Sequence, residues 1–163
     1  MNNFVKRTIS GIGFAAIMLA AFLTNKFIFG AVMLFALIVM MWEFLRMTCG
    51  KEYRYSQILS IVAGVTLFTL VYLYRGFNFP GRLVILAFVP VFILMINSLY
   101  VKDKSRFNKF ANLYTAIIYI AVPWSVLNFA AFSADGTFNG MLLLCFFAII
   151  WGTDVGAYLF GIT

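Results

Sequence analysis

The chain has 163 residues, of which 64% are hydrophobic, 19% aromatic and only 10% charged. Soluble globular domains carry about 25% charged residues, so this composition excludes an ordinary soluble protein and indicates a polytopic membrane protein. The formal net charge is +7, and the absence of histidine excludes Cys/His zinc sites, haem ligation by histidine and Ser-His-Asp catalysis within the chain.

Hydrophobic runs predict an all-α polytopic membrane protein with six transmembrane helices in a single domain over 1–163. The first helix covers 8–23, directly after a basic leader, and is interpreted as uncleaved because no small-residue cleavage site follows it. The other five helices are predicted, in chain order, over 27–47, 57–74, 83–100, 110–132 and 140–160. Pro90 is expected to kink the fourth helix, and Pro123 lies inside the fifth.

The cations are distributed unevenly between alternate connections. One set of connections carries nine of them, which are Lys6, Arg7, Arg46, Lys51, Arg54, Lys102, Lys104, Arg106 and Lys109. The other set carries three, which are Lys26, Arg75 and Arg82. Lys and Arg accumulate in cytoplasmic loops of membrane proteins. The pattern therefore predicts that both termini are cytoplasmic, and the cluster at 102–109 is interpreted as a topology determinant and a contact for anionic lipids.

One carboxylate lies inside the last predicted membrane helix. Asp154 follows Gly140 by a distance of roughly 21 Å along a helix, in a hydrocarbon core about 30 Å thick. An ionised carboxylate at such a depth costs several kcal/mol unless it has a partner, so Asp154 is a candidate for binding a substrate, metal or ion. Helical spacing places Trp151, Val155 and Tyr158 on the same face. The alternative is a structural aspartate that is hydrogen-bonded to a neighbouring helix or paired with an arginine.

Two further features of the membrane segments have both structural and functional interpretations. Ala148, Gly152 and Gly156 form a stripe of small residues that favours close approach of another helix. Glu43 lies near the end of the second helix, where it has either a substrate role or a structural pairing with Arg46. Residues alone thus leave three functions open: an enzyme acting on a lipid head group, a proton- or cation-coupled transporter, and a non-catalytic membrane subunit. An inverted repeat, typical of many transporters, is not evident.

Three short motifs narrow this choice. Residues 154–161 read Asp-Val-Gly-Ala-Tyr-Leu-Phe-Gly, residues 6–9 read Lys-Arg-Thr-Ile before Gly11, and residues 42–44 read Trp-Glu-Phe. The first resembles the D-x-x-A-Y-x-x-G segment of the CDP-diacylglycerol synthase (phosphatidate cytidylyltransferase) family. The other two resemble the amino-terminal part of the same family. The resemblance covers all 163 residues in segment order.

The resemblance implies a multi-pass enzyme of the bacterial inner membrane that joins CTP and phosphatidic acid into CDP-diacylglycerol and pyrophosphate. It implies a divalent cation, Mg²⁺, as cofactor. Asp154 would be a catalytic residue and a metal ligand, and Tyr158, one turn further on, would bind a substrate phosphate. The implied partners are CTP, phosphatidic acid and the lipid bilayer, with no nucleic acid and with room for a homodimer.

Members of this family continue beyond the aspartate helix with a cytoplasmic loop and further helices that carry more of the site. The chain is therefore expected to be the amino-terminal portion of a longer membrane enzyme. On this expectation Asp154 has only a partial role, and residues 1–163 alone have no cytidylyltransferase activity.

Overall fold

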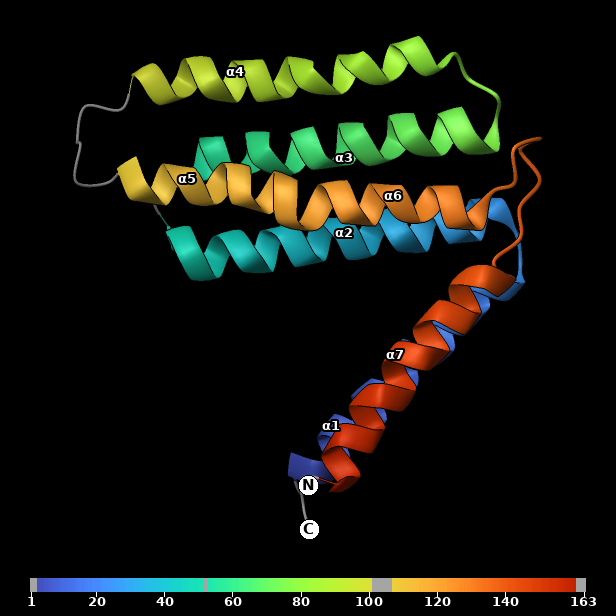
Figure 1. Cartoon of the computed structure of the whole chain (residues 1–163). Helices are drawn as coiled ribbons and strands as arrows, with labels where there is room; N and C mark the ends of the chain where they lie inside the picture. Colours follow the sequence, from blue (N-terminus) through green and yellow to red (C-terminus); the bar gives the residue numbers. More distant parts are fainter. Residues whose placement is uncertain (1–2, 52, 101–106, 161–163) are drawn as a thin grey trace.

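The computed structural model describes residues 3–51, 53–100 and 107–160, and the helices in this part of the chain form six rods (Figure 1). Two rods change helix type along their length without interruption. The bounds are α1 (Asn3–Leu23), α2 (Lys26–Cys49), α3 (Arg54–Gly76), η1 continuing into α4 (Gly81–Ala87 and Phe88–Leu99), α5 continuing through η3 into α6 (Phe107–Ala116, Ile117–Ala121 and Val122–Ala131), and α7 (Met141–Phe160). The predicted all-α architecture and helix order are confirmed.

Four of the rods are long and apolar enough to cross a membrane. They are Lys26–Cys49, Arg54–Gly76, Gly81–Leu99 and Lys109–Ala131. The apolar stretches described for the first and last rods are shorter, Gly11–Leu23 and Met141–Asp154. Six helices were predicted to span the membrane, and four meet that criterion of length and composition. Spanning by α1 and α7, and the cytoplasmic location of both termini, stay predictions.

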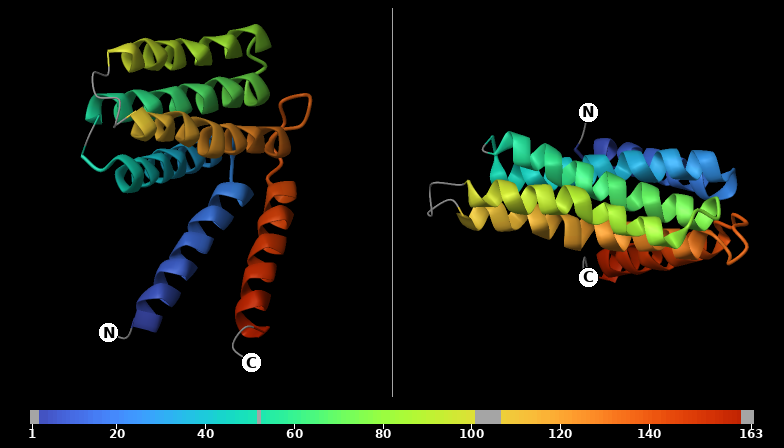
Figure 2. Two further views of the ribbon diagram at one scale, coloured as in Figure 1. Left: turned by 60° about the vertical axis from the view of Figure 1, so that its left-hand side comes forward. Right: turned by 90° about the horizontal axis from the view of Figure 1, so that it is seen from above.

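The four long rods lie side by side in a bundle, whereas α1 and α7 leave it (Figure 1). Within the bundle α3 contacts α2, α4 and α6, so it is the central helix. The end of α1 and the start of α7 lie at the end of the bundle that holds the 24–25 and 132–140 connections, and the two helices diverge from each other with distance from it (Figure 2). The start of α1 and the end of α7 thus lie on the same side, away from the bundle.

The buried side of α2 is a row of large side chains at intervals of four residues. It consists of Phe29, Met33, Leu37, Met41, Leu45 and Cys49. Opposite this row α3 presents small and polar residues, and Gly64 is the closest point. A Cβ atom at Gly64 would overlap the sulfur of Met41 and lie 3.0 Å from the Cβ of Ala121. Small residues permit such close approach of helices in membranes.

A π-helical turn, η3, lies in the middle of the rod from α5 to α6. Buried residues of this rod recur at intervals of four, at Leu113, Ile117, Ala121 and Ser125. Twelve residues exceed three α-helical turns by about one residue at 3.6 residues per turn. The π-turn absorbs that residue, because the Val122 N–H donates to the carbonyl of Ile117 five positions back. Pro123 follows directly, where its ring would clash with an i−4 carbonyl in a regular α-helix.

A change of helix type lies just before Pro90, and the kink predicted at this residue stays a prediction. The 3-10 segment η1 ends at Ala87, and α4 begins at Phe88, so Pro90 lies in the first turn of an α-helix. The preceding turn is 3-10 and not α-helical, and in a regular α-helix the proline ring would clash with the i−4 carbonyl.

Hydrogen bonds tie the bundle helices together across long sequence separations. Trp124 Nε1 donates to the carbonyl of Met33 at 2.8 Å, which joins α6 to α2. Ser60 Oγ donates to the carbonyl of Leu113 at 2.8 Å, which joins α3 to α5. Ser56 Oγ and Asn97 Oδ1 are 3.1 Å apart and join α3 to α4. Such bonds hold helices together where apolar surfaces give little preference between lipid and protein.

Candidate functional site

Asp154 lies in the last two turns of α7, and its side chain is exposed in the described part of the chain. Its neighbour Thr153 donates its hydroxyl to the carbonyl of Ile150 at 2.7 Å and so takes part in the helix itself. The carboxylate is therefore placed on a helix surface that the described residues leave uncovered. That surface is available to a substrate, an ion or another helix.

The face predicted to be shared by Trp151, Asp154 and Tyr158 has two environments. Trp151 is half-buried and packs against Phe147, with ring centroids 5.9 Å apart. Asp154 is exposed. Tyr158 belongs to α7, one turn after Asp154, but its side chain lies outside the described residues. The structure thus confirms the helical spacing between Asp154 and Tyr158 and leaves their predicted roles untested.

The small-residue stripe of α7 has no partner within the described part of the chain. A Cβ atom built at Gly152 or Gly156 would meet nothing within 4 Å. The close approach of α7 occurs at Gly140 instead, where an added Cβ would overlap the backbone of Phe22. The rings of Phe22 and Phe147 then pack with centroids 5.2 Å apart. The glycine that brings α1 and α7 together is therefore the one just before the first turn of α7.

The described residues do not fit a complete divalent-metal site. No group of three or more His, Cys, Asp or Glu side chains comes together among them. Mg²⁺ requires near-octahedral oxygen coordination, usually with one or two carboxylates, several waters and substrate phosphates. Asp154 alone supplies one carboxylate on α7, and Glu43 is an exposed residue of α2. The predicted role of Asp154 as a metal ligand is thus not supported by a second ligand in this part of the chain.

The cations at the two ends of the bundle have different surroundings. At the end where α3 and α5 begin, Lys51 and Arg54 are exposed and Lys109 is half-buried. At the opposite end, Lys26 Nζ donates to the carbonyl of Gly76 at 3.2 Å and lies 4.1 Å from the centroid of the Phe77 ring.

Arg75 also belongs to this opposite end, where its guanidinium donates to the carbonyl of Phe132 at 2.7 Å. Two of the three cations at this end therefore hold loops and helix ends together. The third, Arg82, is exposed, as Lys51 and Arg54 are at the other end.

Comparison with known proteins gives one positive finding. The profile of the Cytidylyltransferase family matches residues 5–163, which is nearly the whole chain. Neither the curated proteins nor the solved structures contain a match to this chain. The match includes α1, the bundle and α7 with Asp154. The resemblance predicted from the three short motifs is confirmed, and the chain belongs to the Cytidylyltransferase family.

Proposed function

We propose that the protein is a phosphatidate cytidylyltransferase of the cell inner membrane, which makes CDP-diacylglycerol from CTP and phosphatidic acid in phospholipid biosynthesis. The observation that carries this proposal is the family match over residues 5–163 of a chain with four helices of membrane length. Cytidylyl transfer to a water-soluble acceptor does not need such helices. They suit transfer to a lipid, because the acceptor phosphate stays at the membrane surface.

In the proposed reaction a phosphate oxygen of phosphatidic acid attacks the α-phosphorus of CTP. A new P–O bond forms, the bond from the α-phosphorus to the oxygen that bridges to the β-phosphate breaks, and pyrophosphate leaves with the electron pair. Both reactants are polyanions. Catalysis of such a step depends mainly on positioning and on stabilising the negative charge, with little covalent participation of the protein.

Within this proposal, Asp154 and Tyr158 act at the end of α7. Tyr158 donates its hydroxyl to a substrate phosphate, and Asp154 contributes a charged oxygen ligand to the site. A requirement for Mg²⁺ and a homodimeric assembly remain parts of the proposal. When bound, the cation would neutralise the phosphates, although no group of three or more ligating side chains comes together among the described residues.

The direct test measures transfer of radiolabel from CTP into lipid. Membranes from cells that express the complete reading frame are incubated with α-³²P-labelled CTP, with and without added phosphatidic acid. We expect labelled CDP-diacylglycerol that depends on phosphatidic acid and exceeds that of vector-control membranes. Lipid that stays unlabelled, in membranes that contain the folded protein, would contradict the proposal.

A second test concerns the side of the membrane, because CTP is supplied from the cytoplasm. Single cysteines replace Asp135 and Lys51, which are both exposed and lie at opposite ends of the bundle. The exposed Cys145 is changed to serine, and the buried Cys49 is retained. A membrane-impermeant maleimide added outside should label Asp135→Cys and spare Lys51→Cys. The reverse pattern would place the end of α7 on the side opposite to CTP.

A further inference from the structure

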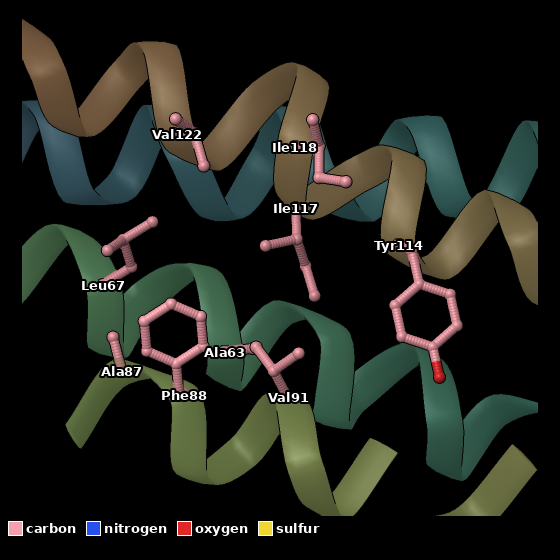
Figure 3. Close-up of a pocket in the computed structure, with 9 residues that line it drawn as sticks. All are labelled: Ala63, Leu67, Ala87, Phe88, Val91, Tyr114, Ile117, Ile118 and Val122. Atoms are coloured by element: carbon pink, nitrogen blue, oxygen red, sulfur yellow. The ribbon is translucent and has the colours of Figure 1, made fainter. Parts of the chain in front are cut away.

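An apolar cavity of about 290 Å³ lies between three rods of the bundle (Figure 3). Its walls come from α3, from the η1–α4 rod and from the rod of α5, η3 and α6. The volume is close to the lower end of the range for ligand pockets, roughly 300–1,000 Å³. Its lining residues are Ala63, Leu67, Ala87, Phe88, Val91, Tyr114, Ile117, Ile118 and Val122.

The cavity exists because its floor is made of small side chains. Ala63 and Ala87 are buried at the floor, where longer side chains would close the space between the rods. The side chains at its rim, Phe88, Ile118 and Val122, are 59%, 68% and 41% exposed. The cavity is therefore a recess that opens to the outer surface of the bundle. Its wall includes the π-turn η3, and π-turns frequently occur at functional sites.

The surroundings of this recess identify the kind of molecule that fills it. All of the lining residues belong to segments that are long and apolar enough to cross a membrane, so the rim faces hydrocarbon. A water molecule needs two to four polar partners, and the phenol of Tyr114 is the one polar side chain among the lining residues. An empty recess would forfeit the dispersion contacts of its walls. A lipid acyl chain supplies those contacts and is already present at the rim.

The recess lies near the middle of the bundle, and the cations at the bundle ends indicate from which end the lipid enters. From Tyr114 to Val122 the recess follows the helix for roughly 12 Å, and Lys109 lies only five residues before Tyr114. This is the end with the exposed cations Lys51 and Arg54. The α2–α3 turn is tied to the start of α5 there, because the Cys49 thiol donates to the carbonyl of Lys109 at 3.4 Å. A phospholipid from this leaflet would bring its phosphate near these cations.

We propose that this recess binds one acyl chain of an anionic phospholipid, whose head group lies at the end of the bundle that carries Lys109 and Arg54. The acyl chain enters between α4 and α5. Entry between α3 and α4 is blocked at this end, because the contact between Ser56 and Asn97 ties these two helices together. The site is separate from Asp154, because α7 lies outside the bundle (Figure 1). The proposal is independent of the reaction assigned above.

The first experiment maps the lipid on the unaltered protein. The full-length protein is reconstituted in phosphatidylcholine vesicles that contain a small fraction of phosphatidylglycerol with a diazirine in its acyl chain. After irradiation, adducts are located by peptide mass spectrometry. We expect them to concentrate in the peptides with Phe88, Val91, Ile118 and Val122. Even labelling of all bilayer-facing helices would overturn the proposal, and so would cross-links between two protein chains at this recess in place of lipid adducts.

The second experiment fills the recess. Ala87→Phe places a ring in the floor, and the matched control Ala111→Phe adds the same ring on an exposed face of α5. Adducts at the recess should be lost in Ala87→Phe and retained in Ala111→Phe. Labelling that survives in a folded Ala87→Phe protein would overturn the proposal. The map of the unaltered protein decides the matter independently if this variant does not fold.

The third experiment tests the head group. A phosphatidylcholine probe with the same diazirine chain should label the recess less than the phosphatidylglycerol probe does. In the Arg54→Gln and Lys109→Gln variants we expect this preference to fall about fivefold per removed cation, as follows from the attraction of one Lys or Arg to an anionic membrane surface. Equal labelling by both probes in the unaltered protein would overturn the assignment to an anionic lipid.

Discussion

The bundle of α2 to α6 and the pair of α1 and α7 are built in different ways. The bundle helices are joined by hydrogen bonds such as Trp124 to Met33 and Ser60 to Leu113. The helices α1 and α7 contact each other and the bundle mainly through a group of aromatic rings around Phe22. Phe22 packs on Phe147 and on Phe29, with ring centroids 5.2 and 6.4 Å apart. A rigid scaffold therefore carries two helices that are fixed at one end, and Asp154 lies at the other end of one of them.

The largest effect is expected at Asp154, on the helix that leaves the bundle. If its charge serves the reaction, Asp154→Asn should lower turnover by roughly 100-fold or more, about 2.7 kcal/mol in the activation barrier. Insertion and folding should be unchanged, since an exposed carboxylate is replaced by an amide of equal size. CTP-dependent lipid synthesis at matched expression is the measurement. Asp135→Asn, in the loop at the start of α7, is the control and should keep full activity.

Gly140 brings α7 against α1, and its substitution comes next in magnitude. In Gly140→Ala the new methyl group would overlap the backbone of Phe22, which cannot move aside as a side-chain end could. We expect a loss of about 1–3 kcal/mol in unfolding free energy, typical of overpacking. Unfolding in mixed micelles measures it.

Gly152→Ala is the matched control for this substitution, because its methyl group meets nothing within 4 Å. It should be neutral or stabilising by about 0.5–1 kcal/mol, since alanine favours a helix interior over glycine. Equal stability of the Gly140→Ala and Gly152→Ala variants would show that α1 and α7 are not held together at Phe22.

Within the bundle, Trp124→Phe should cost less than the change at Gly140. It removes the N–H that donates to the carbonyl of Met33 while keeping an aromatic ring. The expected loss of unfolding free energy is about 0.6–1.7 kcal/mol, the range for hydrogen bonds between membrane helices. Trp42→Phe, on an exposed face of α2, is the control for the aromatic change itself. If Trp42→Phe lost as much unfolding free energy as Trp124→Phe, the hydrogen bond from Trp124 to Met33 would not contribute to stability.

The smallest effect concerns the loop between the regions. Asp135 is exposed, and the hydroxyl and backbone N–H of Thr137 donate to its carboxylate at 2.8 and 3.2 Å. The hydroxyl, followed by the backbone N–H, lowers the pKa of Asp135 below its ordinary value. A lowered pKa in the folded state stabilises the loop above the ordinary value of about 3.9. That contribution is lost as the pH falls through the lower folded pKa.

Removal of the Thr137 hydroxyl should therefore raise the pKa of Asp135 towards its ordinary value. Carboxyl NMR of ¹³C-labelled aspartate, assigned with Asp135→Asn, measures this in Thr137→Val. Ser133→Ala is the control, since Ser133 contributes its backbone N–H and carbonyl to the loop, bonded to Thr137 and Gly136. A pKa of Asp135 that does not change in Thr137→Val would show that the hydroxyl bond is absent in solution.

Hydropathy was sufficient to place the helices but not to orient them. The predicted gap at 24–26 coincides with the start of α2, where the Asn25 side chain accepts a hydrogen bond from the Ile28 N–H. By contrast α2 is apolar all round, so no periodicity marks Phe29 or Leu37 as buried and Phe35 as exposed. In α3 the sequence does indicate the buried side, because the small and polar residues Ser60 and Gly64 lie on it.

The position of the candidate residue Asp154 on its helix was predicted, whereas its surroundings were not. Asp154 is on the predicted helix, yet the small-residue stripe at Gly152 and Gly156 meets no part of the described chain. The direction of α7 depends on the contact of Gly140 with Phe22, which lies in a distant part of the sequence. The recess around Ala63 depends on three rods at once, so no local pattern predicts it.

The bond from Trp124 to Met33 has a consequence for biosynthesis. Its two residues are 91 positions apart, and the bond from Ser60 to Leu113 spans 53 positions. As the chain leaves the ribosome, α2 and α3 can pair early as a hairpin, but the hydroxyl of Ser60 meets its acceptor only after α5 has been made. The bundle therefore closes late, when α6 enters the membrane. Until then the part of the α3 surface that later meets α5, including the Ser60 hydroxyl, is open to whichever insertion factor accompanies the nascent chain.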